Sequence, residues 1–554
     1  MNDRFKRILS SPKAINRLIG FALAGGYLAV LLATASDIGF ARDEGFYFTA
    51  SRSYQRWFDE LFENPAKAFT RESIDRHWKY NHEHPALMKT LFGFSERIFH
   101  KKLGVMNPST ANRFPGMITG ALTLYLIFIF GAEVFDRRAG LIAALFFGFM
   151  PRVFYHAHLA CFDMPITMMW IAVFYCYYKS LSSRKWGIIA GAVFGLALCT
   201  KLNAFFLPFL VTAHYLAYFV YCKKKSLPRP MPWAVVFGAI LAPIVFMAHW
   251  PWVWFDTLHR LGGYMGFHAG HPFYNTAWFN ENIIGPPTPI ALPSGMTLFT
   301  VPTVIILLFL FGAVLRLRHH LPAALKKKLP AALAPTAPKS TNGFDLLWFM
   351  AFVFPIALIS MPFVPIFGGT KHWMPAYPFM TLIAGAAAAR FIDIVVALVP
   401  KIPVKAVTVV TALVLLLPPL QQTITSHPFG LETYVPLIGG APGAASLGMT
   451  RQFWGYTTRS VVPWMNEEFP DGARVEIHDT TVSSWRMYQE DGILHRNLKP
   501  VRLSQSNVAF LHHELHMVLV ENWIWARYNT FAPEHVLTFQ GVPILSIYVK
   551  PDKR

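Results

Sequence analysis

Residues 18–36 decide the fold: the stretch reads LIGFALAGGYLAVLLATAS, nineteen residues without a charge. A helix of this length is long enough to cross the hydrocarbon core of a bilayer. Residues 1–17 before it carry five basic residues against one acidic residue and lack the small-residue cleavage site of a secretory signal. The pattern predicts a first membrane span whose basic end lies in the cytoplasm.

The rest of the chain repeats this pattern. Of its 554 residues 54% are hydrophobic and 14% are charged, and short polar breaks separate the apolar runs. Eleven spans are expected, at 18–36, 113–132, 139–157, 164–181, 187–200, 203–222, 233–251, 297–315, 344–362, 374–392 and 405–421. The sequence therefore predicts a polytopic α-helical membrane protein of about 11 spans, with the N-terminus cytoplasmic and the C-terminus outside.

The net charge of +20 follows the same division. Basic clusters such as Arg184-Lys185 and Lys223-Lys224-Lys225 lie in short segments between spans, whereas residues 37–112 hold eleven basic and ten acidic residues. Basic segments stay in the cytoplasm, so the nearly neutral segments are expected outside. No nucleic-acid-binding motif or aromatic-interleaved basic patch accompanies the charge, so nucleic acid is not an expected partner.

We expect three parts: a cytoplasmic N-terminus at 1–17, a transmembrane domain at 18–421 with outer loops 37–112 and 252–296, and a small extracytoplasmic α/β domain at 430–554. Alternating runs at 474–478, 517–521 and 542–549 predict strands in the last part, and 461–468 and 523–530 predict helices. In the first outer loop, 44–62, 74–78 and 85–99 are expected to form helices on the membrane surface. The proline-rich segment 316–343 is expected to be a cytoplasmic linker.

The second outer loop is rich in aromatic residues, including Trp252, Trp254, Tyr264, Tyr274 and Trp278. Two interpretations stay open: an aromatic belt at the membrane interface, or stacking and hydrogen bonding to a sugar or prenyl chain.

An adjacent acidic pair, Asp43 and Glu44, follows the first span within about ten residues of the membrane surface. Carboxylates near hydrocarbon are costly unless they have a partner or a function, so both are candidates for a functional site. The alternative is an ordinary pair of loop acids after the end of a helix.

Several short motifs share the outer side of the membrane and occur in a fixed order. They are Arg42-Asp43-Glu44-Gly45, His84-Pro85, Arg113-Phe-Pro-Gly116, Asp163-Met-Pro165, Thr200-Lys201 and Thr370-Lys371-His-Trp-Met-Pro375-Ala-Tyr-Pro378. With these motifs the chain resembles, over essentially its whole length, the C-type glycosyltransferases of the dolichyl-phosphate-mannose protein mannosyltransferase and aminoarabinose transferase superfamily, and it is similar to glycosyltransferase family 39.

The resemblance implies roles for the carboxylates. A sugar on a polyprenyl phosphate is transferred when an acceptor nucleophile displaces the phosphate from the anomeric carbon, and one carboxylate base suffices for a single inverting displacement. By similarity Asp43 is that base, Glu44 supports it or orients the acceptor, and Asp163 is a second carboxylate of the active-site region.

Cations are needed to neutralise the leaving phosphate. The resemblance implies that Lys201, Lys371 and Arg113 do so, although basic residues at span ends can also be anchors whose side chains reach towards water. His84 is expected to form a hydrogen bond within the site. His82, Glu83 and His84 leave a divalent cation open as a cofactor, without a recognised metal-binding motif.

The expected activity is that of an integral membrane glycosyltransferase. It passes a hexosyl or pentosyl group from a polyprenyl-phosphate donor to a protein, lipid or glycan acceptor outside, and the lack of a retention signal favours a bacterial inner membrane. A lipid or sugar transporter or flippase is the alternative, but such proteins commonly consist of two related halves, and no such symmetry is visible. A structural scaffold would not need the acidic pair.

Overall fold

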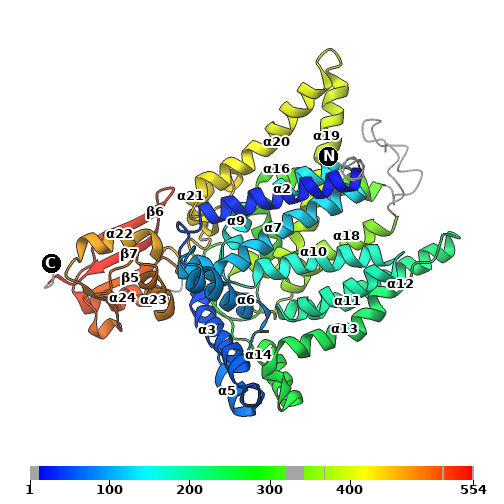
Figure 1. The fold of residues 1–554 in the computed structure, drawn as a ribbon. Helices are drawn as coiled ribbons and strands as arrows, with labels where there is room; N and C mark the ends of the chain where they lie inside the picture. Colours follow the sequence, from blue (N-terminus) through cyan, green and yellow to red (C-terminus); the bar gives the residue numbers. More distant parts are fainter. Residues whose placement is uncertain (1–10, 319–341, 367, 515–516, 552–554) are drawn as a thin grey trace.

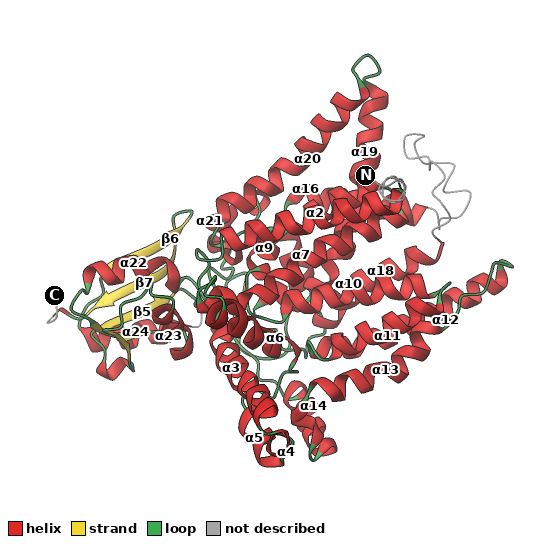
Figure 2. Ribbon diagram, viewed as in Figure 1, coloured by secondary structure: helices red, strands yellow, loops and turns green. Residues whose placement is uncertain are grey.

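The computed structural model describes residues 11–318, 342–366, 368–514 and 517–551. These residues are mostly helical, and the larger of two sheets lies near the C-terminus (Figure 2). The first ten residues of the expected N-terminal segment and most of the expected linker 316–343 lie outside the described residues.

Each of the eleven predicted spans overlaps at least one helix. These helices are α2 (Pro12–Ala33), α7 (Pro108–Val134), α8 (Arg137–Gly148), α9 (Pro151–Ala157), α10 (Asp163–Ser180), α11 (Arg184–Leu198), α12 (Leu207–Lys224), α13 (Trp233–His249), α15 (Leu292–Thr300), α16 (Thr303–Leu317), α18 (Asn342–Ile359), α19 (Tyr377–Leu398) and α20 (Val404–Ser426). Among the described residues, five helices are long and apolar enough to cross a membrane, or up to seven if each bent pair is one span. The protein is a polytopic α-helical membrane protein, and the number eleven stays a prediction.

Two predicted spans are not straight helices. Residues 139–157 form α8 and α9, whose axes differ by 75°, and the range 297–315 covers the 119° bend between α15 and α16. Pro151 begins α9 and Pro302 precedes α16. Proline has no N–H to donate and restricts the residue before it, so both breaks follow from the sequence.

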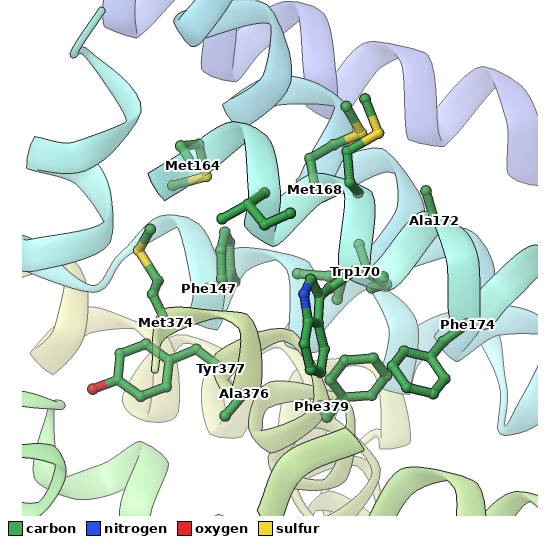
Figure 3. Packing of buried hydrophobic residues seen from close by; sticks show 14 of the residues in the cluster. Phe147, Met164, Met168, Trp170, Ala172, Phe174, Met374, Ala376, Tyr377 and Phe379 are labelled. Carbon is green, nitrogen blue, oxygen red and sulfur yellow. The ribbon is translucent and has the colours of Figure 1, made fainter. Parts of the chain in front are cut away.

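The long helices run side by side across the molecule (Figure 1). Contacts join α2 to α7, α7 to α10, α10 to α11 and α11 to α13. Helix α10 also packs against the first turn of α19: the rings of Phe174 and Phe379 lie 5.3 Å apart, and Trp170 is fully buried beside them (Figure 3). This packing fixes the middle of α10 relative to the beginning of α19.

The two outer loops are largely structured. The first contains α3 (Arg42–Glu63), α4 (Pro65–Ala68), α5 (Arg71–Trp78), α6 (Leu87–Ser95) and the π-helix η1 (Glu96–Lys102). The second contains the 3-10 helix η3 (Pro251–Trp254), α14 (Thr257–Ala269) and an antiparallel pair of strands, β1 (Thr276–Trp278) and β2 (Glu281–Ile283). The predicted helices of the first loop are confirmed.

The C-terminal region contains a five-stranded mixed sheet flanked by helices. The strands lie in the order β4-β3-β5-β7-β6, with β3 parallel to β4 and β5, and β7 antiparallel to β5 and β6. The elements are α22 (Thr458–Glu468), β3 (Ala473–Glu476), α23 (Val482–Glu490), β4 (Leu498–Pro500), β5 (Val508–His512), α24 (Val518–Tyr528), β6 (His535–Phe539) and β7 (Val542–Val549). The strand predicted at 517–521 is wrong because this apolar run begins α24, and a short apolar run does not distinguish strand from helix.

The C-terminal region packs on the segment that joins α2 to α3. The ring of Phe40 stacks on Tyr488 at 4.2 Å, and its backbone N–H donates to the Tyr488 hydroxyl at 2.7 Å. Gly39 allows a close approach, because a Cβ there would lie 1.7 Å from the carbonyl oxygen of Tyr456. The backbone that leads to Asp43 is therefore held from both sides.

Candidate active site

A cavity of about 750 Å³ lies between the membrane helices, the second outer loop and the C-terminal region. Five of the seven residues predicted for the site line it: Asp43, His84, Asp163, Lys201 and Lys371. They come from segments spread over more than three hundred residues of the chain. The fold brings most of the predicted site together in one space.

Asp43 lies in the first turn of α3, where the N–H of the preceding Arg42 donates to the carbonyl of Trp454 at 2.9 Å. Its carboxylate is 3.5 Å from Nζ of Lys371. The Asp43 side chain is 32% exposed, whereas that of Lys371 is only 4% exposed. Asp43 thus faces a fixed cation while its carboxylate remains open to the cavity.

Lys371 is held by an aromatic wall and a tight turn. Its Nζ lies 3.8 Å from the ring centroid of Trp454, a cation–π contact. Gly368, with φ of +81°, precedes it, and a Cβ at this glycine would lie 2.6 Å from the ring of Phe453. Glycine is therefore required both by the left-handed backbone and by the close ring.

Asp163 and Lys201 form a second acid–base pair in the cavity wall, with Nζ of Lys201 2.6 Å from the carboxylate of Asp163. Asp163 is the first residue of α10, where the helix dipole favours a negative charge. Lys201 follows α11 in an extended conformation that turns the chain into the next helix. The charge of this lysine is already balanced by Asp163.

His84 lies in a turn whose backbone carbonyls accept hydrogen bonds from Lys89. The ammonium of Lys89 is fully buried and donates to the carbonyl of His84 at 2.9 Å and to the carbonyl of Asn81. Burial lowers the pKa of Lys89 to about 7, and burial together with the charge of Lys89 holds the pKa of His84 well below its usual value. Nδ1 of His84 is buried without a hydrogen-bond partner among the described residues, so this neutral ring has capacity left for a ligand.

His82, Glu83 and His84, the three residues considered as ligands of a divalent cation, do not form a common binding site. His82 packs on Trp252, with ring centroids 4.6 Å apart, and Glu83 accepts a hydrogen bond from Asn81 at 2.6 Å. In the described part of the chain, no group of three or more His, Cys, Asp or Glu side chains lies close enough to hold a metal ion.

Glu44 and Arg113 are placed differently from the prediction. They form a buried ion pair, with Nε and Nη2 of Arg113 at 2.8 and 2.7 Å from the two carboxylate oxygens. Arg113 also donates to the carbonyls of Ala35, Ile38 and Gly39, and its side chain is 1% exposed. The expectation that Arg113 binds the donor phosphate and that Glu44 orients the acceptor is therefore corrected, because neither side chain lines the cavity. The other expected role of Glu44, support of Asp43, stays a prediction.

One cation of the cavity was missed by the sequence analysis. Arg152, on the short helix α9, lines the cavity although it is 7% exposed, and its Nη1 lies 3.4 Å from Oγ1 of Thr370. Its guanidinium is 5.3 Å from the ring centroid of Tyr434, and its Nε has no hydrogen-bond partner among the described residues. The signal was present, since a charge inside an apolar run of a membrane protein marks a functional candidate.

Part of the chain that contributes to this cavity is similar in sequence to a known protein family. The family model described as dolichyl-phosphate-mannose-protein mannosyltransferase matches residues 83–252, which include His84, Arg152, Asp163 and Lys201. This region of the chain is therefore similar to that family of glycosyltransferases.

Solved structures of two other proteins are similar to this chain over most of its length. ArnT from Cupriavidus metallidurans is 14% identical in the apo state, with 96% of this chain and 98% of that chain covered and a TM-score of 0.48. The form of ArnT bound to undecaprenyl phosphate is 13% identical to this chain, with the same coverage and a TM-score of 0.45. Archaeal oligosaccharyltransferase AglB from Archaeoglobus fulgidus, in complex with an inhibitory peptide and a dolichol-phosphate, is 12% identical to this chain. The similarity covers 81% of this chain and 58% of that chain, with a TM-score of 0.44. A comparison with curated protein sequences gives no match.

The aromatic residues of the second outer loop divide into two groups. Tyr274 and Trp278 line the cavity, together with His268. Trp254 instead stacks on Phe69 at 5.7 Å, and Tyr264 packs on Trp250. One part of the loop is thus available to a ligand, and the other part is packing.

Proposed function

We propose that the protein transfers a sugar from a polyprenyl-phosphate donor to an acceptor on the extracytoplasmic side of the membrane, with Asp43 as the base. The observation that carries the proposal is a carboxylate open to a large cavity, 3.5 Å from a buried lysine. A bacterial inner membrane with the C-terminal region outside is part of the same proposal.

The donor phosphate fits the cationic wall. Lys371 and Arg152 are both buried in this wall, and Nε of Arg152 has no hydrogen-bond partner within the part of the chain that the structure describes. Buried guanidinium and ammonium groups bind phosphate strongly and lose little by ordering when the phosphate arrives. The charge of Lys201 is balanced by Asp163, so Lys371 and Arg152 are the cations proposed to hold the phosphate.

The prenyl chain requires an apolar path that is continuous with the phosphate site. The cavity wall includes a set of aromatic and aliphatic side chains from α10, the segment before α12, α18 and the residues after it, namely Trp170, Phe206, Phe354, Leu358 and Phe363. Phe363 is 77% exposed, so this wall reaches the surface of the protein. Each CH₂ group buried against such a wall contributes about 0.8 kcal/mol.

The proposed transfer is a single displacement. The acceptor hydroxyl attacks the anomeric carbon as its proton passes to the Asp43 carboxylate, and the bond between that carbon and the phosphate oxygen breaks. The electron pair leaves with the oxygen, so polyprenyl phosphate departs with its charge held by Lys371 and Arg152. Such a displacement inverts the anomeric configuration.

Purified protein incubated with a panel of polyprenyl-phosphate sugars tests the proposal by release of free polyprenyl phosphate. At least one donor is expected to be turned over. Translocation of donor lipid between leaflets of a vesicle, without release of polyprenyl phosphate from any donor, would instead support a flippase.

A further inference from the structure

The cavity continues beyond Asp43 into the C-terminal region, where its wall changes character. On that side it is lined by Gln452, Asp479 and Glu514, with Arg42 at the edge. We propose that this wall is an acceptor subsite that binds the hydroxyl groups of a neutral carbohydrate. The inference rests on the proposed function, because it names the acceptor class of the same site.

Charge divides the cavity into two ends. One end holds Arg152 and Lys371 together with the ion pair of Lys201 and Asp163, and the other holds Asp479 and Glu514. Asp43 lies between them: it is 3.5 Å from Lys371, and its neighbour Arg42 is bonded to Asp479 at 3.0 Å. A phosphate at the cationic end would leave the opposite side of the reacting carbon facing the acidic end, which is where an in-line displacement needs the acceptor.

The titration of Asp479 agrees with this placement. Burial and, as a smaller contribution, the charge of Asp43 raise its pKa to about 6, while Arg42 acts in the opposite direction. The two carboxylates therefore sense each other across a short distance.

A buried polar atom in this wall has no partner. Gln452 is 1% exposed, and its Nε2 donates to Glu514 at 2.6 Å. Its Oε1 is buried without a hydrogen-bond partner among the described residues. Leaving such an oxygen unpaired costs free energy, and a hydroxyl donor arriving in the cavity would satisfy it.

The wall offers mainly acceptors. The carboxylate oxygens of Asp479 and the amide oxygen of Gln452 accept hydrogen bonds, and a sugar supplies several hydroxyl donors in a small volume. Burial and the charge of Asp479 hold the pKa of Glu514 well above its usual value, so this carboxyl carries a proton and can also donate to a hydroxyl oxygen. A peptide backbone brings one carbonyl acceptor for each N–H, and an anionic group would meet the carboxylates of Asp43 and Asp479. The half-buried ring of Phe453 lines the same cavity and offers an apolar face for a sugar ring.

Binding of simple probes tests the subsite directly. Methyl α-D-glucopyranoside, methyl α-D-mannopyranoside, glucuronate and a short threonine peptide are titrated into the detergent-purified protein and followed by saturation-transfer NMR. A neutral glycoside is expected to bind more tightly than glucuronate or the peptide. Asp479→Asn and Gln452→Met are each expected to weaken its binding about tenfold, the size expected for hydrogen bonds to charged or buried groups.

Asp471→Asn is the matched control, since Asp471 is an exposed acid of the same region that does not line the cavity. It is expected to bind the glycoside as the unmodified protein does. If Asp479→Asn does not yield monodisperse protein, glycoside binding by Gln452→Met tests the subsite alone, because this substitution keeps the size and burial of the side chain. Equal weakening in Asp471→Asn, unchanged binding in Gln452→Met, or preferred binding of glucuronate or the peptide would overturn the subsite.

The two proposals fail in different ways. Glycoside binding that depends on Gln452 without release of polyprenyl phosphate from any donor would contradict the proposed function alone. Release of polyprenyl phosphate from a donor without binding of either neutral glycoside would contradict the subsite alone.

Discussion

Asp43 and Glu44 are adjacent in the sequence, yet the structure gives them opposite surroundings. Glu44 is fully buried and accepts hydrogen bonds from Arg113 and from the backbone N–H groups of Ala41 and Ala160, both at 2.9 Å. Asp43 is one-third exposed and forms an ion pair with Lys371 at 3.5 Å. Successive side chains on a helix point about 100° apart, so one turns towards α7 and the other into the cavity.

The different surroundings of Glu44 and Asp43 indicate that the two residues of this motif have different roles. A carboxylate whose oxygens are saturated by a bidentate arginine and two N–H groups has little capacity to accept a proton from a substrate. It can, however, anchor the turn between α2 and α3 to α7, which fixes the backbone of its neighbour. We infer that Glu44 holds Asp43 in place and that Asp43 acts on the substrate.

The largest effect is expected when the buried pair is broken. Arg113→Ala leaves the Glu44 carboxylate buried without its cation, at a cost of about 3–5 kcal/mol. Thermal unfolding in detergent should show a large loss of stability or no folded protein. Lys371→Ala is the matched comparison, because the partner it leaves behind reaches solvent; a loss of stability in it as large as in Arg113→Ala would contradict the distinction.

An intermediate effect is expected on donor binding. Lys371→Ala removes a buried cation from the proposed phosphate site, so the affinity for undecaprenyl phosphate should fall about tenfold or more, as for a lost hydrogen bond to a charged group. Lys371→Arg should recover part of the affinity, since a guanidinium also pairs with phosphate. Lys102→Ala, an exposed lysine of the first outer loop, is the control. Unchanged affinity in monodisperse Lys371→Ala would show that this lysine is only an anchor.

The smallest effect concerns Glu432, another buried carboxyl, which accepts a hydrogen bond from the hydroxyl of Tyr456. Burial raises its pKa to about 8. A raised carboxyl pKa stabilises the folded protein below the unfolded value near 4.5, and this contribution is lost as the pH rises towards 8. Glu432→Gln should therefore be most stabilised relative to the unmodified protein near pH 8, with a smaller difference at pH 5, measured by thermal unfolding.

Glu44→Gln is the comparison for this pH series. It removes the partner of Arg113, so it should be less stable than the unmodified protein at both pH values. A loss of stability in Glu432→Gln as large as in Glu44→Gln at pH 8 would contradict the difference between a carboxyl with a cation and one without.

The sequence allowed the helical membrane fold to be predicted because each span carries its own signal in a local apolar run. It also placed Asp43, Asp163 and Lys371 on one side of the membrane. It could not separate Glu44 from Asp43, because the direction of each side chain depends on Arg113, which is far away in the chain. Gln452 and Asp479 were missed for the same reason: their role arises only when the C-terminal region covers the cavity.

The same dependence on distant partners explains why Arg152 was not predicted as a site residue. Its run of residues was taken as one continuous span, and only the break at Pro151 and the contact with Thr370 show that its side chain faces the cavity. Charges inside apolar runs and prolines within predicted spans were the two local signals that pointed to it.

Turnover and stability of Asp43→Asn and Glu44→Gln, measured side by side, test the central claim most directly. Using a donor that releases polyprenyl phosphate with the unmodified protein, Asp43→Asn should keep the unfolding temperature and donor affinity but lose about a hundredfold or more in turnover. Glu44→Gln should lose unfolding temperature, with a much smaller loss of turnover per folded molecule. Turnover of Asp43→Asn within about threefold of the unmodified protein, far less than the loss of a general base causes, would contradict the assignment of Asp43 as the base.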